Sequence, residues 1–152
     1  MKKMTMSRRI AAPRPAVFAA CTDFPNAAER VEGITNVKML TDGPVGKGTR
    51  FEETRTMFGK DATETLEVSA FDPDRSVTVS CFSCGVEYDS TFTFSDDGGG
   101  TRVDLEIVTT PKTIGAKIFS PIMGAMMGKM MKKCIEQDLD DLQKHCETDA
   151  AG

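Results

Sequence analysis

The chain has 152 residues, of which 39% are hydrophobic and 28% are charged, and its formal net charge is −4. This length and balance fit one globular domain with a core of its own. The basic residues are spread along the chain and form no basic stripe, so we expect no nucleic-acid partner. No run of about 18 apolar residues occurs, so we expect no stable insertion into a membrane.

The N-terminus and the cysteines bear on the compartment. Residues Met1 to Ser7 lack the apolar stretch of a secretory signal. The five cysteines are odd in number and have no framework spacing, which favours reduced thiols over disulfides. We therefore expect a cytoplasmic protein.

The first elements in the chain are a strand and two short helices. Met4 to Ile10 has the alternation of a strand. A proline-rich segment leads into a short helix from Ala16 to Cys21, since proline is favoured in a first helical turn. A second short helix, Ala27 to Val31, is closed by Gly33.

Six more strands follow, separated by segments rich in turn residues. The pattern predicts strands over Ile34 to Leu40, Thr49 to Met57, Asp61 to Phe71, Val77 to Phe82, Glu87 to Phe94 and Thr101 to Thr109. Short connections between strands give antiparallel pairing. We expect a curved antiparallel sheet.

The last third of the chain changes to a helical pattern. It runs from about Ile114 to His145, and a helix of about 30 residues is long enough to cross such a sheet at about 1.5 Å per residue. We therefore predict an α+β fold, with a seven-stranded curved antiparallel sheet around a long C-terminal helix and two short helices after strand 1. Residues 1–146 are expected to form the single domain, and residues 147–152 a flexible C-terminal tail.

Two hairpin turns suggest how the strands pair. Phe58-Gly59-Lys60-Asp61 suits a type II′ turn with Gly59 first of the two central residues, which sets Phe58 opposite Asp61. The pairs that follow are Arg55 with Glu64, Glu53 with Leu66, and Phe51 with Val68. In the second hairpin the expected pairs are Phe94 with Val103, Phe92 with Leu105, Ser90 with Ile107, and Tyr88 with Thr109. Glu53, Arg55 and Glu64 then share a face with apolar residues.

Charged side chains on a buried face are costly unless they are paired. An Arg55–Glu64 pair inside the sheet is therefore either a structural ion pair or a group that anchors a ligand. The alternative is a wet sheet rim, where these charges are simply solvated. Arg55 and Glu64 are also the candidates for acid–base chemistry on a bound carbonyl compound.

The predicted long helix carries a broad apolar stripe that is rich in methionine. Such a stripe usually fills a core, but methionine side chains adapt to irregular shapes. Facing a curved sheet, the stripe favours a largely apolar cavity. The expected lining is Phe51, Glu53, Arg55, Glu64, Leu66, Tyr88, Phe92, Phe119, Met123, Met126, Met127 and Met130.

Two motifs resemble chemical sites but do not support one. Cys81-Phe82-Ser83-Cys84 is a CxxC at the end of a strand, where side chains three residues apart point to opposite faces. His145 is the only histidine, which excludes a site with several histidine ligands and speaks against a Ser-His-Asp triad. We expect neither a metal nor a cofactor.

Several segments in this order resemble a known superfamily. They are Ile10 to Phe18, Asp23-Phe24-Pro25, Val45 to Phe51, and Gly99 to Val103. Together they are similar to the SRPBCC superfamily, which includes START domains, Bet v 1-like proteins and the polyketide cyclase/dehydratase group. This chain looks most like the bacterial polyketide-cyclase-like branch, from Met4 to about Leu142. The resemblance implies a helix-grip fold with a deep hydrophobic cavity, and it assigns no catalytic residue.

Three functions remain open from the sequence. The first is binding or carrying a small hydrophobic ligand, since members of the superfamily bind lipids, polyketides, sterols or hormones. The second is a polyketide cyclase or dehydratase-like enzyme, and the third is a protein-interaction module of the co-chaperone kind. The sequence does not decide between a monomer and a homodimer.

Overall fold

Alternating apolar residues pair into seven strands, and a helical C-terminal segment follows them. The structure is a computed structural model that describes residues 2–57, 59–83, 85–113 and 121–151; side chains are described in these ranges except at 57, 121–127 and 149–151. The elements are β1 (Lys2–Ile10), α1 (Arg14–Thr22), η1 (Phe24–Asn26), α2 (Ala27–Arg30), β2 (Ile34–Met39), β3 (Arg50–Met57), β4 (Lys60–Asp72), β5 (Ser76–Ser83), β6 (Val86–Asp97), β7 (Gly100–Pro111) and α4 (Pro121–Ala151).

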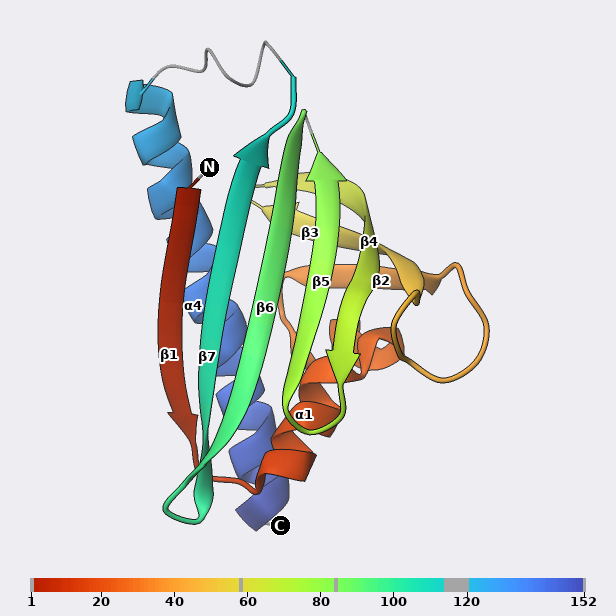
Figure 1. The fold of residues 1–152 in the computed structure, drawn as a ribbon, viewed down its shortest axis with the longest axis vertical. Coiled ribbons are helices and arrows are strands. Elements are labelled where there is room, and N and C mark those ends of the chain that lie inside the picture. The colour runs from red at the N-terminus through yellow and green to blue at the C-terminus, as the bar shows by residue number, and fades with distance from the viewer. Residues whose placement is uncertain (1, 58, 84, 114–120, 152) are drawn as a thin grey trace.

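The seven strands form one antiparallel sheet in the order β1-β7-β6-β5-β4-β3-β2. Strands β2 to β7 pair in chain order, and β1 adds to the sheet beside β7. Helix α4 lies along one face of the sheet, with α1 near the C-terminal end of that helix (Figure 1). The predicted fold class is confirmed.

The sheet is curved toward the helices. Pairing shifts by one residue in β2 between Ile34 and Asn36, and in β4 between Val68 and Ala70. Such bulges bend a strand and increase its twist. In Figure 1, β2 and β3 accordingly run across the direction of β1 and β7, so the sheet has a concave inner face.

The core lies between this concave face, α1 and the C-terminal part of α4. The ring of Phe18 in α1 makes edge contacts with Phe71 and Phe94, each at 5.3 Å between ring centroids. Leu139 and Leu142 of α4 are buried in the same cluster. These contacts fix α1 and the end of α4 against the sheet.

The first hairpin pairs differently from the prediction. The structure sets Met57 opposite Lys60, Glu53 opposite Glu64, and Arg55 opposite Ala62, which is a shift of two residues. Gly59 has a φ of 79° and is the second connecting residue, whereas the predicted turn placed it first. The Arg55–Glu64 pair was therefore wrong. Because a shift of two keeps each side chain on its face, all three charged residues still point to the concave side.

The second hairpin pairs as predicted. Tyr88, Ser90, Phe92 and Phe94 lie opposite Thr109, Ile107, Leu105 and Val103. Its two connecting residues, Gly98 and Gly99, have φ values of 56° and 86°. Positive φ at both positions is what a type I′ turn requires.

The C-terminal helix differs from the prediction at its end. Of the range expected to be helical, residues 114–120 lie outside the described residues. At the other end α4 continues to Ala151 rather than stopping near His145. The carboxylate of Glu147 accepts hydrogen bonds from the backbone N–H of Ala11 at 2.8 Å and from Nε2 of Gln143 at 3.1 Å. In the described part of the chain, no helix is both long and apolar enough to cross a membrane.

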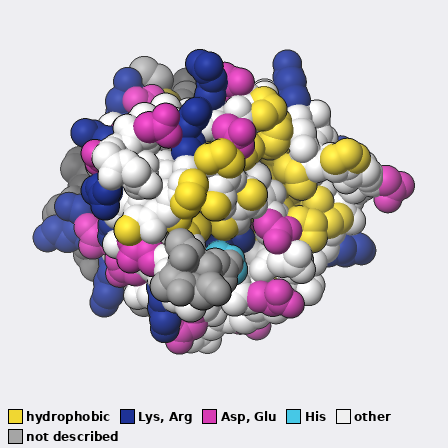
Figure 2. Space-filling view, turned by 90° about the horizontal axis from the view of Figure 1, so that it is seen from below, with side chains coloured by type: hydrophobic (Ala, Val, Ile, Leu, Met, Phe, Trp, Pro, Cys, Tyr) yellow, Lys and Arg dark blue, Asp and Glu magenta, His cyan; other side chains and the backbone are white. Residues whose placement is uncertain are grey.

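The lower end of the molecule in Figure 1 presents hydrophobic side chains to solvent. In Figure 2 these side chains form a connected area across the middle of that end. Acidic and basic side chains are interspersed around it, so this view shows no large region of one sign of charge.

Candidate functional site

A cavity of about 190 Å³ lies between the concave face of the sheet and the helices. Most of the side chains around it are apolar. The sheet contributes Phe51, Leu66, Val79, Phe92, Leu105 and Ile107, and α4 contributes Ile135, Leu139 and Leu142. Phe24 of η1 stacks on Phe51 with ring centroids 4.6 Å apart, which closes part of the wall. A concave, mostly apolar space with few polar groups is the usual form of a small-molecule site.

One cluster of charged side chains interrupts the apolar lining. Nη1 of Arg55 in β3 lies 2.9 Å from both carboxylate oxygens of Asp138 in α4. Nη2 of Arg55 also lies 3.6 Å from Oε1 of Glu53, two residues earlier in the strand. All three side chains line the cavity. The cluster therefore joins the sheet to the long helix at the wall of the cavity.

Burial and pairing act on these charges in opposite directions. Burial alone lowers the pKa of Arg55, but the carboxylates of Asp138 and Glu53 together raise that pKa above its ordinary value. Burial raises the pKa of Asp138 from 3.8 to about 6, and it outweighs the lowering effect of the Arg55 guanidinium. Asp138 can therefore gain or lose a proton near neutral pH.

Asp138 was not among the predicted site residues. It stands on the apolar stripe of α4, three residues after Ile135 and one before the buried Leu139. A carboxylate on the buried face of a helix calls for a cation opposite it. This position in the stripe was a signal for the missed residue, and Arg55 is the cation that meets it.

Arg30, at the end of α2, is a second cation that the sequence analysis missed. Its side chain lines the cavity and is half-buried. Among the described residues, no carboxylate lies within 4.0 Å of its guanidinium. The sequence offered no sign of this role, since Arg30 belongs to a four-residue helix with mixed composition.

The predicted site residues in the sheet divide into two groups. The residues that line the cavity are Phe51, Glu53, Arg55, Leu66 and Phe92. Glu64 is not among the lining residues; its carboxylate accepts a hydrogen bond from Ser83 Oγ at 2.8 Å. Tyr88 lies opposite Cys81 and is likewise not in the lining. The expected joint action of Arg55 and Glu64 has no direct contact to support it.

Cys81 lies close to Glu64 and Glu53, which are paired across β3 and β4. Burial is the main cause that raises the pKa of its thiol to about 11, and the charges of Glu64 and Glu53 contribute to the same rise. A thiol with so high a pKa is a poor nucleophile at neutral pH. Cys84, the other cysteine of the CxxC motif, lies outside the described residues.

Most side chains of the predicted methionine-rich wall lie outside the part of the chain that the structure describes. Phe119 lies outside the described residues, and so do the side chains of Met123, Met126 and Met127. The side chain of Met130 is 38% exposed and is not in the lining. The described wall from α4 consists instead of Ile135, Leu139 and Leu142, together with Asp138.

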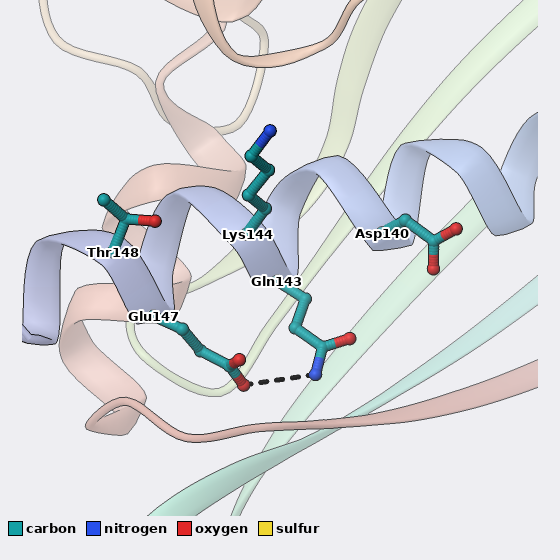
Figure 3. Close-up of a pocket in the computed structure, with 5 residues that line it drawn as sticks. All are labelled: Asp140, Gln143, Lys144, Glu147 and Thr148. Carbon is teal, nitrogen blue, oxygen red and sulfur yellow. Dashed lines mark hydrogen bonds between the residues drawn. The ribbon is translucent and has the colours of Figure 1, made fainter.

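A larger hollow of about 550 Å³ lies beside the C-terminal part of α4. Figure 3 shows its five lining residues, Asp140, Gln143, Lys144, Glu147 and Thr148, all on that one helix. They are polar or charged. Because one helix supplies every residue, the hollow cannot enclose a ligand, and the smaller cavity under the helix is the better candidate.

The described residues provide no metal site. No three His, Cys, Asp or Glu side chains within them form a group that could hold a metal ion. The carboxylates of the cavity instead face Arg55.

A family model described as polyketide cyclase / dehydrase and lipid transport matches residues 1–147. The chain belongs to this family. A comparison with curated proteins found no match for this family member.

Solved structures with the same fold resemble this polyketide cyclase/dehydrase family member at low identity. A Thermus thermophilus protein is 20% identical, with a TM-score of 0.80 over 99% of this chain and 100% of its own. A Streptomyces aromatase/cyclase is 17% identical, with a TM-score of 0.79 over 96% of this chain and 93% of its own. A START superfamily protein from Mycobacterium smegmatis is 13% identical, with a TM-score of 0.77 over 96% and 97%. These likenesses establish the Bet v 1/START fold.

Proposed function

We propose that this family member binds and carries a small hydrophobic molecule in the cavity beneath α4. The observation that carries the proposal is the cavity itself, which is walled by apolar side chains from strands β2 to β7 and from α1, η1, α2 and α4. Its volume of about 190 Å³ equals roughly six water molecules at about 30 Å³ each. A ligand of modest size, smaller than most drug-like molecules, fits such a space.

A second candidate is a polyketide cyclase or dehydrase activity. The observation that favours it is Asp138, a carboxyl group with a pKa of about 6 beside Arg55 at the cavity wall. A carboxylate near its pKa can accept a proton from a bound carbonyl compound, and a guanidinium can stabilise the enolate that forms. Asp138 would then be the base that deprotonates the bound carbonyl compound, the role for which Glu64 was predicted.

The two candidates respond differently to loss of Arg55 and Asp138. If the protein only binds, the double variant Arg55→Met/Asp138→Leu keeps its affinity for an uncharged ligand within about twofold. If it is a cyclase, the same variant binds a poly-β-ketone substrate but no longer converts it. Product analysis by mass spectrometry separates these results.

The binding proposal is tested by filling the cavity. Ser90 lies on the inner face of β6, opposite Val79 and Ile107, and lines the cavity. A phenylalanine in its place occupies the space that a ligand needs. We expect Ser90→Phe to weaken the binding of 1-octanol at least tenfold, measured by isothermal titration calorimetry.

The matched control is Thr93→Phe, which places the same side chain on the outer, exposed face of β6. Its affinity for 1-octanol should equal that of the unchanged protein. A folded Ser90→Phe variant that binds 1-octanol as well as the control would show that the cavity is not the binding site.

A further inference from the structure

Arg30 differs from Arg55, the other described cation of the cavity lining, because no described carboxylate is paired with it. Arg55 is engaged by both Asp138 and Glu53, which are the two acidic residues of the lining. Arg30 lines the same cavity, and no acidic side chain of the described residues lies within 4.0 Å of it. Among the side chains that the structure describes, this positive charge of the cavity has no acidic counterpart.

The segment that leads into the described side chains of α4 carries no acidic residue either. Residues 114–127, which include the start of α4, contain no aspartate or glutamate. A half-buried guanidinium that lacks an anionic partner gives up part of its hydration without the compensating charge pair. A bound anion would provide it.

The charge of Arg30 also affects the pKa of a buried side chain, Cys21. Burial raises the pKa of the Cys21 thiol to about 12, and Arg30 acts against this rise and lowers it. Cys21 is buried and lines the cavity as well. The guanidinium therefore acts on the interior side of α2, where a ligand would lie.

We propose that the cavity takes an anionic amphiphile, whose carboxylate pairs with Arg30 and whose hydrocarbon part lies among Phe24, Phe51 and Leu139. An arginine binds a carboxylate through two parallel hydrogen bonds, so it fixes the head group as well as attracting it. This inference rests on the proposed binding function and narrows the ligand class to hydrophobic acids.

The test compares octanoate with 1-octanol, two ligands with the same hydrocarbon chain length and different head groups. Calorimetric titrations are made with the unchanged protein, Arg30→Gln, Arg30→Lys and Arg75→Gln. Arg75 is an exposed arginine at the turn between β4 and β5, so its variant is the matched control for loss of one positive charge.

We expect Arg30→Gln to lose at least tenfold in affinity for octanoate and to bind 1-octanol within twofold of the unchanged protein. Arg30→Lys should recover part of the octanoate affinity, and Arg75→Gln should change neither ligand. The unchanged protein should also bind octanoate more weakly as salt is raised from 50 to 500 mM, with 1-octanol nearly unaffected. This salt series needs no variant and serves if Arg30→Gln does not fold.

Two results would overturn the inference. If Arg30→Gln binds octanoate normally, or loses both ligands equally, Arg30 does not pair with the head group. Binding of 1-octanol together with failure of octanoate to bind would reject the acid while leaving the binding function in place. If neither ligand binds the unchanged protein, the proposed function fails and this inference fails with it.

Discussion

Arg55 connects two elements that are 83 residues apart in the sequence, because its guanidinium meets Asp138 of α4 from its own position in β3. Its side chain is 20% exposed and that of Asp138 is 31% exposed. Removing one partner of a largely buried pair leaves the other charge uncompensated, which costs more than the pair itself contributes.

We therefore predict that Arg55→Met lowers the free energy of unfolding by about 2 kcal/mol, a discounted figure because water still reaches Asp138. The double variant Arg55→Met/Asp138→Leu should be more stable than Arg55→Met alone. Urea denaturation measures both. Arg50→Met, on the exposed side of the same strand, is the control and should stay within about 0.5 kcal/mol. The single variant Asp138→Leu completes the comparison. If the changes in unfolding free energy of Arg55→Met and Asp138→Leu add up to that of the double variant, a direct pair is contradicted.

Asp138 also gives the stability of the protein a dependence on pH. Its pKa is raised from 3.8 to about 6 in the folded state, so the folded protein holds this proton more tightly than the unfolded chain. The stability that the bound proton provides is fully present below pH 3.8 and is lost as pH rises through about 6.

Asp138→Asn cannot titrate and should not show this loss. Between pH 4 and pH 7, the free energy of unfolding of the unchanged protein should fall by about 1 kcal/mol more than that of the variant, since one pKa unit corresponds to about 1.4 kcal/mol and the site is partly solvated. Urea unfolding at several pH values gives both curves. Parallel curves would mean that the carboxyl group has an ordinary pKa.

At the scale of single residues, the sequence shows which side chains face inward but not which of them contact one another. The alternation along β3 placed Glu53 and Arg55 on the inner face, and the structure agrees. The partner of Arg55 depends on how α4 crosses the sheet, and no local pattern specifies that crossing. Arg30 was missed because it belongs to a four-residue helix whose mixed composition does not show which side chains face inward.

At the scale of elements, the two hairpins show when turn residues determine the register. Gly98 and Gly99 both have positive φ and connect β6 to β7, and the predicted register of this hairpin is confirmed. The first hairpin has one glycine that fits either central position of the turn, and the prediction chose the wrong one. An ambiguity of two residues leaves the alternation unchanged, so the hydrophobic pattern could not correct it.

Gly100 fixes the contact between the start of β7 and the end of β1. A Cβ atom at this position would lie 2.7 Å from the carbonyl oxygen of Ile10 and 2.9 Å from Nη2 of Arg9. Because the closest atom belongs to the backbone of a paired strand, it cannot move away without disturbing the pairing of Ile10 with Thr101.

We predict that Gly100→Ala lowers the free energy of unfolding by about 1–3 kcal/mol, the usual cost of overpacking. Thermal or urea unfolding measures the change. Gly46→Ala is the matched control, since a Cβ atom there meets nothing within 4 Å. Equal stability of the two variants would show that β1 and β7 can separate at this end without cost.

At the scale of the whole molecule, the order of the elements carried the prediction. One strand, two short helices, six strands and a long helix fit a helix-grip fold, and the seven-stranded sheet with α4 along one face confirms it. The cavity depends on how far the curved sheet stands away from the helix. That separation results from the bulges in β2 and β4 and from the packing of α1, which single-sequence patterns do not specify.

The central claim is that a hydrophobic ligand enters this cavity, and methyl NMR spectra recorded during a titration with 1-octanol test its location directly. The account predicts saturable shifts for the methyl groups of Leu105, Ile107 and Leu139, which line the cavity. The chemical shifts of the methyl groups of Val108, which lies on the outer face of β7, should not change. Unshifted cavity methyl groups at saturating 1-octanol, or equal shifts on both faces of β7, would contradict the account.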